Sequence, residues 1–203
     1  MAILIGLVLA VRLAQGTPGG EKTGYPKRKG PNGAPVHVIV YSDFQCPACA
    51  GVREPVEILR NQFPDSILLE FRHFPLERPH RWALTAALLT ECAAGQGKFW
   101  ELHDQIYAQQ ANWANEADAL PLLVGYAHGV GLEVRSLERC LADSKTLAHV
   151  RAERAAGEAR QVRSTPTIFI NSHRLVGAPE LAAEGRKLVL QELGRLDAGE
   201  EAR

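Results

Sequence analysis

The chain has 203 residues, 46% of them hydrophobic, and its 23 Lys and Arg residues are balanced by 23 Asp and Glu residues. This length and composition fit one folded domain with an insertion or with tails. Zero formal charge and the lack of a dominant basic stretch argue against a nucleic-acid partner. The sequence contains no P-loop, GxGxxG or GxSxG motif, so nothing in it supports a nucleotide-binding, dinucleotide-dependent or hydrolytic function.

A short apolar segment lies at the start of the chain. Residues 2–11 (AILIGLVLAV) carry no charge, and Arg12 ends the run. Ten residues are too few to cross a bilayer, which needs about 20, but they match the core of a secretory signal. We therefore predict a signal peptide or short membrane anchor over residues 1–13, although the usual basic residues before the apolar core are absent. An exported protein meets oxidising surroundings, in which disulfides persist.

The next segment reads as a linker, followed by a βαβ unit. Residues 14–35 are rich in Gly and Pro and lack apolar periodicity, which predicts a flexible linker. Lys27-Arg28-Lys29 within it is expected to be a solvated cluster in a loop. A strand over 36–41, a helix from Cys46 to about Phe63 and a strand over 67–74 follow. This order predicts two parallel strands with a right-handed crossover.

The second half of the chain is mostly helical. From Pro79 to about Arg160, apolar residues recur at three- and four-residue intervals. The strand period returns at 167–170, and residues 174–176 are its predicted hairpin partner. A last helix is predicted to begin at Pro179 and to extend through Leu193, followed by a charged tail over 197–203.

These elements predict an α/β domain interrupted by helices. One sheet must include the strands from both ends of the chain, because the helical block between them contains no strand pattern. We therefore assign residues 36–77 and 161–196 to the α/β domain. The helical block, residues 78–160, is then an insertion into that domain.

The motif Cys46-Pro47-Ala48-Cys49 lies directly after the first predicted strand, where the helix is expected to begin. Two cysteines at this spacing can form a disulfide across one helical turn. Pro47 suits the first helical position, where its missing N–H costs nothing. The N–H groups of Ala48 and Cys49 then stay free to stabilise a sulfur at position 46. Since such surroundings favour the thiolate, the species that attacks disulfides, the motif predicts thiol–disulfide exchange.

Metal binding or a structural disulfide is the alternative interpretation of this motif. Zinc normally takes four ligands, often from two such pairs. The sequence has no second CxxC motif and no following His-x(3–5)-His pair. We therefore favour redox chemistry and predict neither a metal nor a cofactor. A soft-metal (copper) binding protein using the same two cysteines is the competing function from another class.

Several segments of the chain match one known family in the same order. They are Ala34-Pro35-Val36, Ser42 to Cys49, Phe74-Pro75-Leu76, Gly97 to Trp100 with His103-Asp104, Ser164 to Asn171, and Leu175-Val176-Gly177. Together they resemble the DsbA-like disulfide oxidases of the bacterial cell envelope, over about residues 34–194. The resemblance implies a thioredoxin-like α/β fold, βαβ then ββα around a central mixed sheet, with an inserted all-helical domain.

The resemblance also implies roles for the site residues. Cys46 is the expected nucleophile, and Cys49 is the buried partner that resolves a mixed disulfide; Pro47 and Ala48 complete the active-site motif. Thr165-Pro166 is expected to face the motif through a cis peptide bond. Pro166 has no N–H to compete for the sulfur, while the backbone of Thr165 can pair with an extended substrate chain.

The other candidate residues have less certain assignments from sequence. By the same resemblance, Cys92 and Cys140 are expected to form a structural disulfide in the helical block, with two unpaired buried thiols as the alternative. Asp43 either moves protons near the cysteine pair or caps the approach loop. His103 is expected to be a hydrogen-bonded core residue, and the three tryptophans are expected to pack or to line a groove.

The function implied by the resemblance is that of an exported thiol–disulfide oxidoreductase. Its expected substrates are reduced or unfolded exported proteins, and its expected reoxidant is a membrane-bound quinone-linked partner, either DsbB-like or VKOR-like. We expect a monomer in the periplasm or cell envelope. A disulfide isomerase or reductase is the alternative. Such isomerases usually carry an N-terminal dimerisation domain, and residues 14–35 are too short and too polar to be one.

Overall fold

The computed structural model describes residues 27–200, with side chains described as far as Arg195. The predicted signal peptide or anchor, residues 1–13, therefore lies outside the described residues, as does the first part of the predicted linker. Within the described part of the chain, no helix has both the length and the apolar character needed to cross a membrane.

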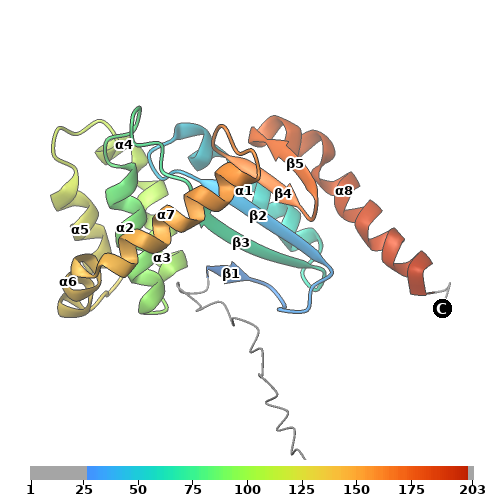
Figure 1. Ribbon diagram of the computed structural model, residues 1–203, viewed down its shortest axis with the longest axis horizontal. Coiled ribbons are helices and arrows are strands. Elements are labelled where there is room, and N and C mark those ends of the chain that lie inside the picture. The colour runs from blue at the N-terminus through green and yellow to red at the C-terminus, as the bar shows by residue number, and fades with distance from the viewer. Residues whose placement is uncertain (1–26, 201–203) are drawn as a thin grey trace, which may run out of the picture.

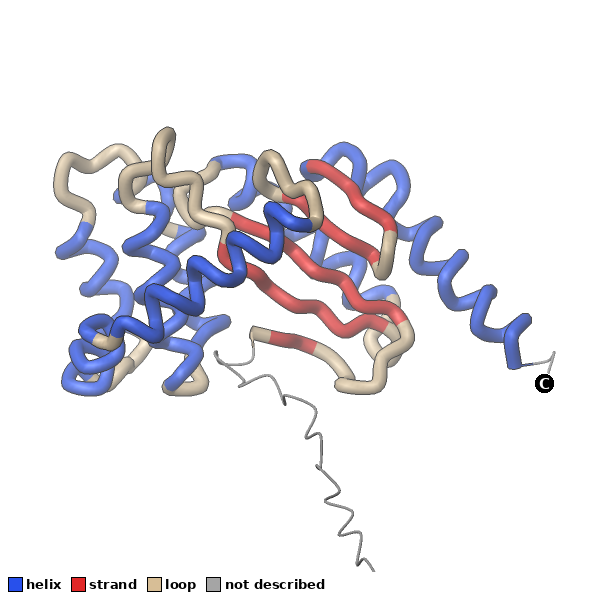
Figure 2. The backbone as a smooth tube through the Cα atoms, viewed as in Figure 1, coloured by secondary structure: helices blue, strands red, loops and turns tan. Residues whose placement is uncertain are grey.

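A five-stranded mixed sheet forms the centre of the fold, with the strand order β1-β3-β2-β4-β5 (Figures 1 and 2). β2 and β3 are parallel and aligned from Val36 and Ile67 onwards, as predicted for the βαβ unit. β4 runs antiparallel to both β2 and β5. The strands are β1 (Arg28–Lys29), β2 (Val36–Ser42), β3 (Ile67–His73), β4 (Thr167–Ile170) and β5 (His173–Val176).

Helices cover both faces of the sheet and form a block beside one end of it (Figure 1). α1 and α8 pack together on one face, whereas α7 crosses the other. The block is built around α2, α3, α5 and α6. The helices are α1 (Pro47–Gln62), α2 (Ala83–Gly95), α3 (Phe99–Ala108), α4 (Gln110–Trp113), α5 (Leu120–Gly129), α6 (Val134–Ala142), α7 (Ser144–Ala159) and α8 (Gly177–Glu200).

The alternation of side chains along β2 explains the two layers of helices. Val36, Val38 and Val40 belong to the core shared with α1 and α8, whereas Tyr41 belongs to a cluster on the opposite face. α1 buries an apolar stripe against the first face: Val52, Val56 and Leu59. Burying each such side chain contributes about 1.5–3 kcal/mol to folding.

α7 lies close to the second face because it carries a glycine where it crosses the sheet. A Cβ atom at Gly157 would come within 2.8 Å of the Phe74 ring and 2.9 Å of the Tyr41 ring. Only glycine allows the helix backbone to approach these rings so closely. The segment predicted as an insertion therefore also supplies one layer of the α/β domain.

The predicted linker contains ordered structure, so the expectation of a solvated loop at Lys27-Arg28-Lys29 was wrong. Arg28 and Lys29 form β1, which pairs antiparallel with β3. Arg28 Nε donates to Glu70 Oε2 at 2.9 Å, and Lys29 Nζ donates to Glu57 Oε1 at 2.7 Å. These acidic partners are 42 and 28 residues away in the sequence. Local composition therefore could not reveal them.

Lys27 is the centre of a buried charge cluster. Its ammonium lies 2.6 Å from Glu91 Oε2 and 2.9 Å from Glu153 Oε1, and all three side chains are at most 3% exposed. The backbone N–H of His73 also donates to Glu153, at 2.7 Å. Burial acts to raise the pKa of Glu91, but the hydrogen bond from His73 and the charge of Lys27 lower it to about 2. The cluster thus ties the start of the described chain to β3, α2 and α7.

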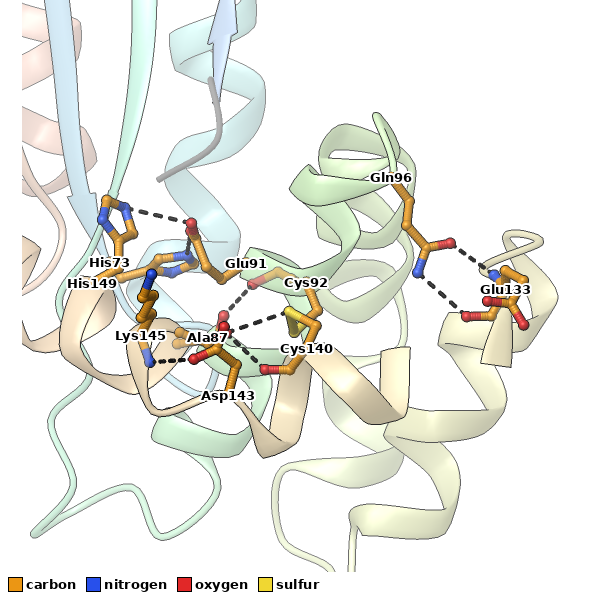
Figure 3. Close-up of a disulfide and its surroundings, with 12 residues drawn as sticks. His73, Ala87, Glu91, Cys92, Gln96, Glu133, Cys140, Asp143, Lys145 and His149 are labelled. Carbon is orange, nitrogen blue, oxygen red and sulfur yellow. Dashed lines mark hydrogen bonds and ion pairs between the residues drawn. A yellow bond between two sulfur atoms is a disulfide. The ribbon is translucent and has the colours of Figure 1, made fainter. Parts of the chain in front are cut away.

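Cys92 of α2 and Cys140 of α6 form a disulfide, with Cα atoms 5.7 Å apart (Figure 3). The structure thus contains the bonded pair and not two free thiols. The bond lies next to the charge cluster, since Cys92 directly follows Glu91. It links two helices of the block and lies outside the Cys46-Cys49 motif.

The last helix extends beyond the predicted limits at both ends. α8 begins at Gly177, whose φ of +74° lies in the region that favours glycine. The Gly177 N–H donates to the Pro166 carbonyl at 3.0 Å, so this turn also supports the loop before β4. The backbone of residues 197–200, predicted as part of a charged tail, is helical, and residues 201–203 lie outside the described chain.

The charge cluster predicts that the same Glu→Gln substitution at two positions of α7 lowers the free energy of unfolding by unequal amounts. Glu153→Gln leaves Lys27 buried with one carboxylate partner fewer, and should lower the free energy of unfolding by about 3 kcal/mol. Glu158→Gln is the matched control, because Glu158 is half-exposed and, among the described residues, forms an ion pair only with Arg154. It should cost less than about 1 kcal/mol. Urea unfolding measures both values, and equal losses would contradict the structural role of the cluster.

The disulfide predicts a large stabilisation of the helical block. Cys92 and Cys140 are separated by 48 residues, and closing such a loop is worth about 4 kcal/mol in the chain-entropy model. The double variant Cys92→Ala, Cys140→Ala should lose about this much stability in urea. Wild-type protein with this bond reduced serves as the control and should show a similar loss. A change below about 1 kcal/mol in both would contradict the prediction.

Candidate active site

The two motif cysteines lie where β2 leads into α1. Cys46 is the N-cap of α1 with extended backbone angles (φ −76°, ψ 121°), and Pro47 is the first helical residue, as predicted. The N–H groups of Cys49 and Ala50 donate to the Cys46 carbonyl at 3.1 and 3.3 Å and close the first turn. Pro47 and Ala48 are exposed, so the motif lies at the surface around a sulfur that is only slightly accessible.

The two sulfurs have very different surroundings. Cys46 is 8% exposed and Cys49 is fully buried, and both are free thiols. The hydrogen bond from the Cys49 thiol is the main reason that the pKa of Cys46 falls to about 5. Burial opposes this shift, while the N–H groups of Cys49 and Ala48 support it. Burial raises the pKa of Cys49, as does its role as donor to Cys46.

The loop before β4 reaches the same sulfur from the far end of the chain. The Thr165–Pro166 peptide bond is cis. Cys46 Sγ lies 3.5 Å from the Thr165 carbonyl oxygen, across 119 residues of sequence. Thr167 Oγ1 donates to the Ser164 carbonyl at 2.7 Å and helps to fix the loop. The fold therefore brings the predicted motif and the predicted Thr165-Pro166 pair together.

Asp43 organises the approach loop. One of its carboxylate oxygens accepts the Gln45 N–H at 2.7 Å, and the other accepts the Leu76 N–H and His80 Nδ1, both at 2.8 Å. Its backbone N–H donates to Cys49 Sγ at 3.4 Å. Of the two roles considered for Asp43, these contacts favour that of a cap for the approach loop.

Three polar side chains at the site were not singled out from the sequence. Gln110 Nε2 donates to the carbonyls of Phe44 and Cys46 at 2.7 and 3.0 Å. The hydroxyls of Ser42 and Tyr107 lie 2.8 Å apart, and Tyr107 also donates to the Asp43 carbonyl at 3.2 Å. The helical pattern predicted α3 but gave no sign of which strand it faces. These contacts join the end of β2 and the loop after it to α3 and α4, over at least 64 residues of sequence.

A cavity of about 540 Å³ lies behind the motif, between α1, α3 and the sheet. Its lining includes Cys49, Ser42, Tyr107 and His103, but neither Cys46 nor Thr165. His103 is buried with Nδ1 2.8 Å from Asp104 Oδ1, as expected of a hydrogen-bonded core residue. Burial lowers the pKa of His103 to about 4, so its ring is neutral at pH 7.

Comparison with known proteins identifies the family. A family model described as Thioredoxin matches residues 22–188. The chain therefore belongs to the thioredoxin family. The predicted fold class is confirmed, and the predicted resemblance to the DsbA-like proteins is confirmed at the level of the fold.

Solved structures show the same fold at low sequence identity. BdbD from Bacillus subtilis in its oxidised form has a TM-score of 0.72 and 20% identity, covering 84% of this chain and 97% of BdbD. Alpha-DsbA1 from Wolbachia pipientis has a TM-score of 0.71 and 22% identity, covering 84% and 94% of the two chains. A thioredoxin-like oxidoreductase from Silicibacter pomeroyi has a TM-score of 0.68 and 20% identity, covering 85% and 92%.

The curated relatives in sequence are much longer proteins. The Na(+)/H(+) antiporter NhaA 1 of Mycobacterium sp. (strain KMS) is 33% identical over 171 residues, which are 82% of this chain and 26% of the antiporter. The NhaA 1 antiporter of Salinispora arenicola is 35% identical over 155 residues, 76% of this chain and 23% of that protein. The chain thus spans about a quarter of the length of the curated relatives it matches.

The site predicts a pH dependence for alkylation of the reduced protein. The rate at Cys46 should follow thiolate formation, with a midpoint near pH 5. Cys49→Ala removes the hydrogen bond that contributes most to this low pKa, and should raise the midpoint by about one unit or more. The measurement is the rate of iodoacetamide modification against pH, with the modified residue identified by mass spectrometry. Cys46→Ala is the control and should not react at low pH, whereas a wild-type midpoint above about 8 would contradict the prediction.

Proposed function

We propose that this chain is an exported thiol oxidase that transfers its Cys46–Cys49 disulfide to reduced proteins. The observation that carries the proposal is the difference between the two sulfurs: the pKa of Cys46 is lowered to about 5 and that of Cys49 is raised. A stabilised thiolate at Cys46 favours the dithiol form of the enzyme. The disulfide form is then a good oxidant.

The reaction follows from this difference in two steps. A substrate thiolate attacks Cys46 Sγ, the bond to Cys49 breaks, and Cys49 takes up a proton. A second substrate thiolate then attacks the substrate sulfur bound to Cys46, forms the substrate disulfide and releases the Cys46 thiolate. Two electrons pass from the substrate to the enzyme. Because the Cys46 thiolate is stable without a proton, it is a good leaving group in the second step.

We assign substrate binding to the loop that carries Thr165 and Pro166. The 3.5 Å contact between Cys46 Sγ and the Thr165 carbonyl places peptide backbone beside the reacting sulfur. Pro166 has no N–H to donate to that sulfur. An extended substrate segment can therefore pair with the backbone at Thr165 while its own cysteine faces Cys46.

The alternatives use the same two cysteines differently. A reductase needs a dithiol that gives up its electrons readily, and a strongly stabilised Cys46 thiolate works against this. A copper-binding protein gains by having further ligands near the pair. Among residues 27–200, no group of three or more His, Cys, Asp and Glu side chains is arranged to hold a metal ion. These observations favour the oxidase.

Export and partners belong to the same proposal. The Cys92–Cys140 disulfide suits an oxidising compartment such as the periplasm or cell envelope. There the chain works as a monomer, and a membrane-bound quinone-linked enzyme, DsbB-like or VKOR-like, restores its disulfide. The ion exchange named in the antiporter relatives is not part of this proposal, because the shared residues are about a quarter of each relative.

A trapping experiment tests the two roles assigned to the cysteines. Cys49→Ser, loaded at Cys46 with a small aromatic disulfide, should form a lasting mixed disulfide with a peptide that has one cysteine. With a matched two-cysteine peptide, the complex should disappear as the peptide forms its own disulfide. Mass spectrometry under non-reducing conditions follows both species. Cys46→Ser, treated in the same way, should give no complex, because Cys49 is fully buried.

The opposite pattern would contradict the proposal. A folded Cys49→Ser protein that forms no covalent complex, or a Cys46→Ser protein that forms one through Cys49, would overturn the assigned roles. Circular dichroism of both variants establishes that they are folded.

A further inference from the structure

Cys49 must exchange a proton in every catalytic cycle, although it has no access to solvent. Its thiolate leaves when the substrate attacks Cys46, and its raised pKa then requires a proton. It must lose that proton again to attack Cys46 when the disulfide is restored. Cys49 is 0% exposed, and Cys46 and Thr165 cover the substrate side at 8% exposure each. The proton therefore needs a route that starts from buried groups.

The cavity behind the motif offers such a route. Cys49 lines it together with Ser42 and Tyr107, whereas Cys46 and Thr165 do not. Since neither residue assigned to substrate contact lines it, the proposed reaction leaves the cavity open.

Two hydroxyl groups connect the sulfur of Cys49 to this cavity. Ser42 and Cys49 both line the cavity, and the Ser42 hydroxyl acts against burial by lowering the pKa of Cys49, which favours the thiolate. Ser42 Oγ and Tyr107 Oη lie 2.8 Å apart, and either can be the donor. Tyr107 Oη is also 3.2 Å from the Asp43 carbonyl, to which it donates. Burial raises the pKa of Tyr107, so its hydroxyl keeps its proton at the pH of catalysis.

We infer that the hydroxyls of Ser42 and Tyr107 carry the proton of Cys49 between its sulfur and the cavity. The inference rests on the proposed function and adds a catalytic residue, Ser42, and a residue that positions it, Tyr107. When Cys49 is a thiol, it donates to Ser42 Oγ, and Ser42 donates to Tyr107. When Cys49 is a thiolate, the Ser42 hydrogen turns to the sulfur and Tyr107 donates to Ser42 instead. The direction of these hydrogen bonds therefore reverses with each proton transfer.

The other groups around Cys49 are less suited to carry its proton than the hydroxyls of Ser42 and Tyr107. The Asp43 carboxylate is bound to the approach loop and to His80. Asp43 contacts Cys49 Sγ only through its backbone N–H. The Cys46 thiolate is the electron donor of the reoxidation step. Further along the cavity wall are charged and titratable side chains from β1, α1 and α3: Lys29, Arg53, Glu54, Glu57, His103 and Asp104.

His103 and Asp104 connect the cavity with solvent. The His103 ring lies 5.0 Å from the Tyr107 ring between centroids, and its Nδ1 contacts Asp104, whose side chain is 52% exposed. Burial lowers the pKa of His103 to about 4, so its ring stays neutral, whereas the Asp104 carboxylate beside it is half-exposed to solvent. The pair thus marks the outer end of the route.

Reoxidation by oxidised glutathione separates the two sulfur attacks. The Cys46 thiolate first attacks glutathione disulfide, forms a mixed disulfide and releases one glutathione thiolate. The Cys49 thiolate then attacks Cys46 Sγ, forms the Cys46–Cys49 bond and releases the second glutathione thiolate. The proton of Cys49 is lost in this second step. Rapid quenching with acid and mass spectrometry follow both steps as a function of pH.

Ser42→Ala should slow the second step about tenfold at pH 7, as expected for a rise of one unit in the pKa of Cys49. The first step should change less than about twofold, and the deficit in the second should disappear as the pH approaches the raised pKa. Ser42→Thr keeps a hydroxyl and should restore the second step. Tyr107→Phe should slow it in the same direction, and carries the test if Ser42→Ala does not fold.

Thr90→Ala is the matched control, because Thr90 is another fully buried hydroxyl and bonds only to carbonyls within α2 in this structure. Both steps should be unchanged in that variant. The inference is overturned if folded Ser42→Ala and Tyr107→Phe leave the second step unchanged, slow both steps equally, or slow the second equally at every pH. Failure of wild-type protein to form any mixed disulfide at Cys46 would instead overturn the proposed function.

Discussion

The site depends on one hydrogen bond, in which the buried Cys49 thiol donates to the sulfur of Cys46. It lowers the pKa of the outer sulfur and raises that of the inner one, so a single proton is shared unequally between them. The backbone N–H groups at the N-terminus of α1 lower the pKa of Cys46 further. Cys46 is therefore a thiolate at neutral pH and can act as nucleophile or leaving group, whereas Cys49 remains protonated.

The rest of the fold serves to keep this pair in place. β2 ends at Ser42, α1 begins at Pro47, and the short loop between them is held by Asp43 from within and by Gln110 from α4. On the outer side, the turn at Gly177 supports the loop that brings Thr165 to Cys46. The inserted helices therefore have two tasks: they enclose the rear of the site, and through α7 they cover one face of the sheet.

Much of the site could be predicted from sequence because its signals are local. The CxxC spacing, the proline at the first helical position and the strand before it all lie within a few residues of one another. The strand at Thr167–Ile170 and its place in the same sheet followed from the change of period along the chain. That Thr165 reaches Cys46 came from the family resemblance, since nothing local in the sequence links positions 119 residues apart.

The parts that sequence did not reveal depend on partners far away in the chain. Lys27 looked solvated because Glu91, its ion-pair partner, is 64 residues further on. From sequence, Ser42 was only the first residue after the predicted strand, and Tyr107 was one more residue of the predicted helical block. The fold places their hydroxyls together. Predicting a buried polar contact requires knowledge of both partner residues, whereas the periodic pattern of a segment describes only the element to which one of them belongs.

The reduction potential of the Cys46–Cys49 couple measures how strongly the Cys46 thiolate is stabilised. It can be measured at equilibrium with glutathione buffers at pH 7, with Cys92 and Cys140 kept bonded. A stabilised Cys46 thiolate predicts a potential less negative than about −230 mV, since each 1.4 kcal/mol that favours the dithiol form raises the potential by about 30 mV. A value as negative as that of thioredoxin, about −270 mV, would contradict the account.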